Sequence, residues 1–141
     1  MNGPSLHLSW PELACRDRLR TPYPLDWRST RAVELAEAFE ALRAAVGLPL
    51  VVLSAYRTAA WNAAVGGRPK SQHLQGRALD LLPPRGWAPA ALGAVAADLE
   101  QIRGLGVYPS RGFVHIDVRP GPRWVDFDAT TATADTVTAF R

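Results

Sequence analysis

Apolar residues recur at helical spacing in two segments of the chain, residues 30–47 and 88–104. Apolar residues three or four positions apart fall on one face of a helix with 3.6 residues per turn, so both segments are predicted to be helices. A glycine, Gly47 or Gly104, stands where each helix is expected to stop. The apolar stripes consist of Leu35, Phe39, Leu42 and Val46 in the first segment and Leu92, Val95, Leu99 and Ile102 in the second. Both stripes predict packing against a core and carry no functional information.

Shorter apolar runs predict strands. Residues 50–56 form a β-branched run that is typical of a buried strand, and residues 77–82 form a second strand that stops at two prolines. Residues 112–119 alternate between apolar and polar side chains, and residues 123–127 are predicted to pair with them across the turn "PGP". Residues 58–65 are predicted to be a short helix with Thr58 as N-cap. Helices and strands in irregular order, without a βαβ rhythm, favour an α+β fold.

Length and composition predict one loop-rich domain. The chain has 141 residues, the size of a single domain, and at 48% apolar residues it can close a core. We therefore expect a single domain over residues 1–141. The net charge of +3 comes from scattered arginines, so the sequence gives no argument for a nucleic-acid partner. With one cysteine, Cys15, no disulfide can form within the chain.

No segment of the sequence reads as a leader or a membrane span. The first residues lack a basic stretch followed by an apolar run, and no segment approaches the roughly 18 apolar residues that a membrane span needs. We therefore expect synthesis in the cytoplasm, no membrane span, and delivery elsewhere by other means. The sequence indicates nothing about the oligomeric state.

The strand over residues 112–119 has a polar face. Successive side chains of a strand point to opposite faces, so His115, Asp117 and Arg119 share one face with Phe113, and the aliphatic residues between them share the other. The aliphatic face is the natural core face. The His–Asp face is therefore either a polar surface or the floor of a cleft.

Asp80 stands among apolar neighbours in the strand over residues 77–82, where it loses hydration unless a positive charge meets it. An arginine in a structural salt bridge would meet it, and so would a metal. Together with His73 and His115 it forms a ligand set of two imidazoles and one carboxylate, which suits zinc and leaves a fourth position for water. Zinc lowers the pKa of coordinated water to roughly 7, which yields a hydrolytic nucleophile. The spacing of these residues is not diagnostic by itself, so a metal-free structural role stays open.

Several segments together resemble one family. "SQHLQGRALD", residues 71–80, matches S-x-H-x-x-G-x-A-x-D, the signature of the zinc D-alanyl-D-alanine carboxypeptidases, whose fold is shared by the hedgehog signalling domain. "LSAYRTAAWNAAVGG" resembles that family's S-x-Y-R-T segment, and "GLGVYPSRGFVHIDVRPGPRW" resembles the segment with the third metal ligand. "LSWPELACRD" is similar to the start of the branch found in phage lysins and small bacterial cell-wall peptidases. The similarity covers about residues 6–124.

The resemblance implies a small, mostly antiparallel sheet with flanking helices, and one Zn²⁺ bound by His73, Asp80 and His115. It implies a zinc peptidase that cuts peptidoglycan stem peptides, either as a D-Ala-D-Ala carboxypeptidase or as an endopeptidase. Arg57 is then expected to bind substrate and to stabilise negative charge on the scissile carbonyl, which suits a guanidinium with its fixed donors. Ser71 and Gln72 could bind substrate, although Ser71 suits a turn equally well.

The general base departs from the family pattern. Relatives often carry an acid a few residues before the last histidine, but here the residues before His115 are "YPSRGFV". The nearest acid is Asp117, to which we assign either the base or a supporting role behind the metal ligands. The missing acid favours an alternative, a non-catalytic zinc module that binds cell wall or a protein.

The family resemblance also implies a setting. A peptidase of this kind would act on the cell wall after lysis, through phage-type delivery, or as part of a larger assembly. Of the five tryptophans, Trp61 or Trp124 is expected to line the groove.

Overall fold

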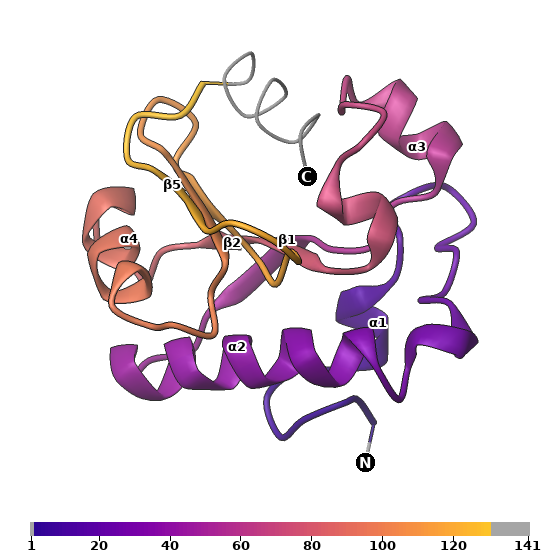
Figure 1. The fold of residues 1–141 in the computed structure, drawn as a ribbon, viewed down its shortest axis with the longest axis horizontal. Helices are drawn as coiled ribbons and strands as arrows, with labels where there is room; N and C mark the ends of the chain where they lie inside the picture. The colour runs from indigo at the N-terminus through magenta and orange to yellow at the C-terminus, as the bar shows by residue number, and fades with distance from the viewer. Residues whose placement is uncertain (1, 131–141) are drawn as a thin grey trace.

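The computed structural model describes residues 2–130, and these form an α+β fold around a five-stranded, mostly antiparallel sheet (Figure 1). The strand order is β1-β2-β4-β3-β5. The strands are β1 (Val51–Ser54), β2 (Ala78–Leu82), β3 (Gly104–Tyr108), β4 (Phe113–Asp117) and β5 (Trp124–Asp126). The helices are α1 (Trp10–Leu13), α2 (Arg31–Val46), α3 (Ala59–Ala64) and α4 (Pro89–Ala97), with short 3₁₀ helices η1 (Leu25–Trp27) and η2 (Gln72–Gln75). The predicted fold class is confirmed.

The long helix α2 confirms the first predicted helix. It ends at Gly47, whose φ of 76° lies in the left-handed region that glycine adopts without strain. Leu35, Phe39 and Leu42 are buried, as the stripe predicts. The short helix α3 is confirmed as well, because the Thr58 side chain accepts a hydrogen bond from the Trp61 backbone and caps the helix.

The helix predicted over residues 88–104 is too long. The helix α4 stops at Ala97, and the chain turns through residues 98–103. Gly104 is the first residue of β3 rather than a helix stop. Ile102 is nevertheless buried, because the turn carries it into the same core that the helical stripe would have reached.

The predicted pairing of the last strand is wrong. β5 pairs in parallel with β3 rather than with β4 across the "PGP" turn. Both edges of β4 are already occupied, by β2 on one side and β3 on the other, each antiparallel. Neither edge of β4 is therefore free to pair with the strand predicted over residues 123–127.

The strand β1 is also less buried than predicted. It lies at the edge of the sheet, and Val51 and Leu53 are 56% and 40% exposed. Its register with β2 shifts between Val52 and Ser54, so the pairing is irregular at the end of β1 nearest Asp80. The chain before α2 contains the short helix α1, which a capping box of Ser9 and Glu12 stabilises.

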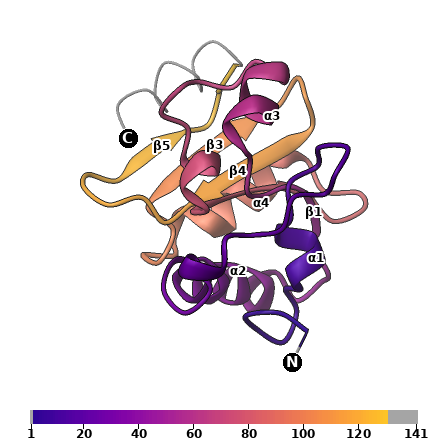
Figure 2. The ribbon, with the colours of Figure 1, turned by 90° about the vertical axis from the view of Figure 1, so that its right-hand side faces the viewer.

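The two faces of the sheet have different partners. α4 packs against β3 and β4 and contacts α2, so these helices cover the face formed by Leu79, Leu105 and Ile116. The segment with α3 and η2 lies on the opposite side of the sheet from α2 (Figure 2). One face therefore closes the core, and the other is left to polar side chains. No helix within residues 2–130 is long and apolar enough to cross a membrane.

Candidate metal centre

The pairing of β2 with β4 brings two of the candidate ligands together. Asp80 lies directly opposite His115 in the antiparallel register, and Ala78 lies opposite Asp117. Opposed residues share a face of the sheet, so Asp80, His115 and Asp117 all lie on the polar face. The sequence left two alternatives for this face of β4, a polar surface or the floor of a cleft. The structure shows a buried floor, because all three side chains are buried.

The third candidate ligand comes from the loop before β2. His73 lies in η2, which begins where the Ser71 hydroxyl accepts a hydrogen bond from the His73 backbone N–H, 3.2 Å away. The turn ends at Gly76, whose φ of 67° needs glycine. The buried Tyr23 hydroxyl donates to the Gly76 carbonyl at 2.7 Å and ties the loop to the core. These local contacts hold His73 over the sheet.

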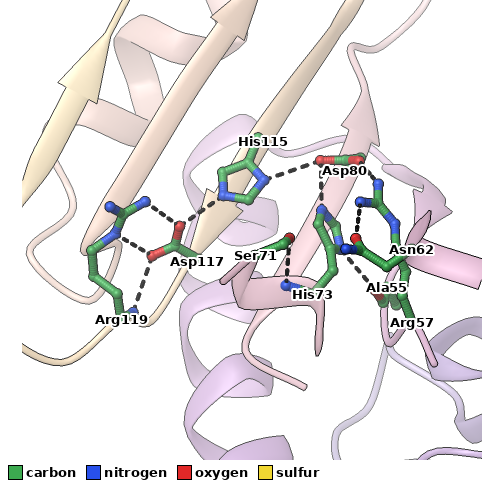
Figure 3. Close-up of polar contacts among 9 residues, drawn as sticks. All are labelled: Ala55, Arg57, Asn62, Ser71, His73, Asp80, His115, Asp117 and Arg119. Carbon is green, nitrogen blue, oxygen red and sulfur yellow. Dashed lines mark hydrogen bonds and ion pairs between the residues drawn. The ribbon is translucent and has the colours of Figure 1, made fainter. Parts of the chain in front are cut away.

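The three side chains converge on one point (Figure 3). His73 Nε2 and His115 Nδ1 each lie 3.2 Å from Asp80 Oδ1. One ligand atom from each residue lies within 4.8 Å of the other two. The structure therefore brings together all three residues that the sequence nominated, in an arrangement that could hold a single metal ion.

The remaining nitrogen of each histidine has a fixed partner. His73 Nδ1 lies 2.7 Å from the Ala55 carbonyl oxygen, and His115 Nε2 lies 2.7 Å from Asp117 Oδ2. Both partners are acceptors, so these nitrogens carry the protons. In the neutral rings, the lone pairs of His73 Nε2 and His115 Nδ1 then face Asp80. Partners of this kind behind the ligands are the usual support of histidine at a metal.

The charges at the site call for a cation. Burial, and then the nearby Arg57, lower the pKa of His73, which favours the neutral ring that binds a metal. Burial alone would raise the pKa of Asp80, but the charge and hydrogen bonds of the neighbouring imidazoles, which act when a ring carries a proton toward the carboxylate, outweigh it and hold that pKa well below its usual range. Asp80 therefore needs a positive charge beside it, which a shared proton supplies in the metal-free site and which a cation bound by two neutral imidazoles would supply in its place. This donor set of two imidazoles and one carboxylate fits zinc.

Asp117 lies behind His115, on the side away from Asp80. Its side chain is fully buried, and Arg119 donates to its Oδ1 from both the backbone N–H, at 3.0 Å, and Nε, at 2.8 Å. Burial would raise the pKa of Asp117, but His115 and Arg119 hold it well below its usual range. Its oxygens are thus occupied by His115 and Arg119. Of the two roles assigned from sequence, this geometry favours support of a ligand over proton transfer.

Arg57 lies beside the candidate metal centre. Its Nη2 is 3.4 Å from Asp80 Oδ2, and its Nη1 is 3.2 Å from the Asn62 side-chain oxygen. Asn62 is buried and is itself held by a 2.7 Å hydrogen bond to the Arg68 carbonyl. The backbone N–H of Arg57 also donates to the His73 carbonyl at 3.0 Å. One segment thus positions both the guanidinium and the first histidine.

A cleft of about 440 Å³ opens beside these residues. Its walls come from the α1–η1 loop, the end of β1, α3 and the β3–β4 turn. The residues that line it include Arg16, Arg57, Trp61, Asp80, Arg111 and Phe113. Trp61 therefore lines the groove, whereas Trp124 packs over Gly106 and under the guanidinium of Arg119.

Ser71 and Gln72 are both buried, with Gln72 only 1% exposed. The Ser71 hydroxyl forms the turn at the start of η2, which is the alternative that the sequence left open. A direct contact of either side chain with substrate stays a prediction.

Sequence reasoning assigned no role to Asn62, Arg119 or the Ala55 carbonyl. Asn62 is a polar residue inside a short apolar helix, which is a signal that could have marked it. Arg119 shares the strand face with His115 and Asp117 and could have been named as their partner. The Ala55 carbonyl carries no sequence signal, because a backbone oxygen is the same in every residue.

Comparison with known protein families agrees with this site. The family model described as peptidase M15 matches residues 6–117, which include all three candidate ligands and Arg57. No curated protein matches the chain. Membership of this family implies a zinc metallopeptidase with a peptide substrate. From its sequence and its site, the chain belongs to the peptidase M15 family, that of the zinc D-alanyl-D-alanine carboxypeptidases.

Proposed function

We propose that the protein hydrolyses peptide bonds in peptidoglycan stem peptides, with Zn²⁺ held by His73, Asp80 and His115. The observation that carries the proposal is the convergence of these three ligand atoms, within 4.8 Å of one another, at the edge of a cleft. Zinc bound there would supply Lewis acidity and a hydrolytic nucleophile at neutral pH. The peptidoglycan substrate is inferred from the family.

Arg57 is proposed to bind the scissile carbonyl and to stabilise the negative charge that develops on it. Its side chain lines the cleft, and its Nη2 faces the Asp80 oxygen that is turned away from the histidines. Asn62 holds the other terminal nitrogen. A guanidinium oriented in advance loses little freedom when charge develops, which is the main source of electrostatic catalysis.

Asp117 is proposed to act on His115 rather than on the substrate. A carboxylate that accepts the outer N–H of a ligating imidazole fixes its tautomer and its orientation. The 2.7 Å contact between Asp117 Oδ2 and His115 Nε2 has this form. Asp117 is therefore a positioning residue.

A second candidate function is a non-catalytic zinc module that binds cell wall or a protein. Among the described residues that line the cleft, Asp80 is the sole acid. Asp117 is enclosed by His115 and Arg119. This absence of a carboxylate general base in the described cleft favours the module, whereas Arg57 beside the metal centre favours the enzyme.

Mass spectrometry of purified muropeptides, after incubation with the zinc-loaded protein, decides between these functions. Loss of one D-alanine identifies a carboxypeptidase, and two peptide fragments identify an endopeptidase. His73→Ala should abolish either product together with zinc binding. Arg57→Gln should lose most activity while keeping zinc.

Elemental analysis of the same preparations supplies the control. A wild-type protein that binds one zinc per chain yet releases no product at any zinc concentration would refute the enzyme and leave the binding module. A protein that holds well under one zinc per chain, even after zinc is added, would contradict both proposals.

A further inference from the structure

A second cavity of about 630 Å³ lies between α1 and the loops that flank η1, and we call it the α1 pocket. Its volume falls in the range of small-ligand sites. No described residue lines both this pocket and the cleft beside Asp80. The lining combines apolar side chains with two arginines, and it includes Trp10, Pro11, Pro22, Tyr23, Arg20 and Arg28.

Arg28 is held on an aromatic stack at this pocket. Its guanidinium carbon lies 4.3 Å from the centre of the Trp10 ring, and Trp10 packs against the buried Tyr23 with ring centroids 6.1 Å apart. The face of a tryptophan attracts a cation without removing its charge. Within the described part of the chain, the Arg28 side chain has no hydrogen bond and no ion pair, and its enclosed Nε meets no acceptor. The stack therefore fixes the guanidinium and leaves its positive charge unneutralised.

Arg20 lines the same pocket from a tightly held turn. It is the one described residue other than glycine with a positive φ, 50°, a conformation that costs energy and persists only where the surroundings impose it. Asp17 imposes it here, because its carbonyl accepts from the Arg20 N–H at 3.1 Å and its carboxylate accepts from the Thr21 N–H and hydroxyl at 2.8 and 2.6 Å. Thr21 thus occupies both carboxylate oxygens of Asp17. The Arg20 side chain has no ion pair among residues 2–130.

The charge of the α1 pocket calls for an anion. Two arginines line it, and no acid is among its described lining residues. A concave surface with one sign of charge concentrates ligands of the opposite sign. The N–H donors of a guanidinium match the oxygens of carboxylates and phosphates. A phosphomonoester carries a charge of about −1.5 to −2 at pH 7, so it matches two arginines better than a carboxylate with its single charge.

We propose that the α1 pocket is a binding site for a phosphomonoester on a compact organic molecule. Arg20 and Arg28 bind the phosphate, and Trp10, Pro11 and Pro22 contact the organic part. The observation that carries this assignment is a pair of arginines, neither with an acidic partner among the described residues, on one pocket with apolar walls. The site goes beyond the proposed function, because it needs neither zinc nor a peptide substrate.

Calorimetric titration of the zinc-loaded protein at neutral pH tests the site with phenyl phosphate, inorganic phosphate, benzoate and phenol as probes. Phenyl phosphate should bind about 10-fold more tightly than inorganic phosphate or benzoate, because it combines the higher charge with an apolar ring. Phenol, which has no charge, should not bind. Absence of phenyl phosphate binding, or equal affinity for any of the other probes, would overturn the assignment.

Substitution of each arginine locates the bound phosphate. Arg28→Gln and Arg20→Gln should each weaken the binding of phenyl phosphate roughly 10-fold to 100-fold. Arg28→Lys keeps the charge but loses the fork of donors, so it should retain part of the affinity. Thermal unfolding checks that each variant is folded. If Arg28→Gln does not fold, Arg20→Gln decides, because the exposed Arg20 takes no part in the core.

Arg18→Gln is the matched control. Arg18 is an exposed arginine in the same turn as Arg20, it is not among the residues lining the pocket, and its substitution removes the same charge. It should keep the wild-type affinity for phenyl phosphate. An equal loss in Arg18→Gln would show an effect of overall charge and overturn the assignment to Arg20 and Arg28.

His73→Ala separates the α1 pocket from the candidate metal centre, where a bound zinc ion could also attract phosphate. This variant should bind phenyl phosphate with the wild-type affinity. Binding that disappears in His73→Ala and is unchanged in Arg28→Gln would place the phosphate at the metal centre and overturn the inference. The titrations measure no peptide hydrolysis, so a failure of the proposed peptidase activity would leave their result unaffected.

Discussion

Asp117 joins a candidate metal ligand to a buried arginine. It contacts His115 Nε2 on one side and Arg119 on the other, and neither acid nor arginine has more than slight exposure. Removing one partner of a buried ion pair costs stability, because the other partner is left buried with an unpaired charge. The pair therefore holds the imidazole firmly while supplying a fixed negative charge behind it.

Replacing this carboxylate tests whether it positions the ligand or moves a proton. Asp117→Asn should weaken zinc binding about 10-fold to 100-fold, because the amide is a poorer acceptor for His115 and for Arg119. Competition with a chelating dye measures the dissociation constant of the metal. If zinc affinity were unchanged while activity disappeared, the positioning role would be wrong and Asp117 would be the base.

At the scale of elements, β3 leaves room for the polar cluster on β4. Gly104 lies opposite Asp117 and Gly106 opposite His115 in the register. A Cβ at Gly104 would collide with the Asp117 carboxylate and with Arg119 Nη2, and one at Gly106 would press on Trp124. The Asp117–Arg119 pair fits over the sheet because the neighbouring strand has no side chain there.

Gly104→Ala is therefore expected to disturb both the fold and the site. The added methyl group should lower the free energy of unfolding by about 1–3 kcal/mol, as overpacking does, and should also weaken zinc binding. Chemical denaturation and metal competition measure the two effects separately.

Gly47→Ala provides the control for that variant. It places alanine in the left-handed conformation at the end of α2, with nothing within 4 Å of the new methyl group. It should cost about 1–2 kcal/mol of stability and leave zinc affinity unchanged. A parallel loss of zinc affinity would mean that any destabilisation weakens the site.

The loop that carries His73 depends on a buried tyrosine. Burial raises the pKa of Tyr23, whose hydroxyl donates to Gly76 at the end of η2. Because the folded pKa lies above the unfolded value of about 10, the contribution of Tyr23 is complete below pH 10 and is lost as pH rises above it.

The free energy of unfolding should accordingly fall above pH 10 by up to about 1.4 kcal/mol per pH unit from this group. Tyr23→Phe should lower stability by about 1–3 kcal/mol at neutral pH, because the Gly76 carbonyl loses its donor, and should flatten the alkaline decline. Urea titrations between pH 8 and 11 measure both. An identical slope in the variant would contradict the role of Tyr23.

At the scale of the whole molecule, the core and the candidate metal centre lie on opposite faces of one sheet. The face toward α2 and α4 is closed by aliphatic side chains, and the other carries His115 and Asp80 under the η2 loop. The apolar core does not include the three candidate metal ligands. The fold is therefore expected to survive loss of the metal, unlike that of a zinc finger.

Removing zinc should lower stability without unfolding the protein. At free zinc 1,000-fold above the dissociation constant, binding to the folded state adds about 4 kcal/mol. Thermal unfolding with and without a chelator should show a lower midpoint for the metal-free protein and a similar circular dichroism spectrum at 25 °C. His73→Ala should show no zinc-dependent shift. A chelated protein that is unfolded at 25 °C would show that the core alone cannot hold the fold.

The sequence by itself determined the features that depend on neighbouring residues. The stripe of α2, its stop at Gly47, the cap of α3 and the end of β2 follow from local spacing and backbone preference, and all are confirmed. The family motif also nominated His73, Asp80 and His115, which the structure brings together. Local patterns suffice for these helix ends, caps and candidate ligands, because each depends on the backbone preference or the ligand chemistry of the residue type itself.

Tertiary structure decided whatever depends on pairing between distant segments. β5 joins β3 because both edges of β4 are taken, and Gly104 serves a strand rather than a helix end. For Asp117, the tertiary structure favours one of the two roles that the sequence left open. Strand alternation could place it on the face of His115, but whether it faced the cleft or lay behind the ligand depended on Arg119 folding back over Gly104. Such an arrangement is fixed by packing across strands, which a linear pattern does not contain.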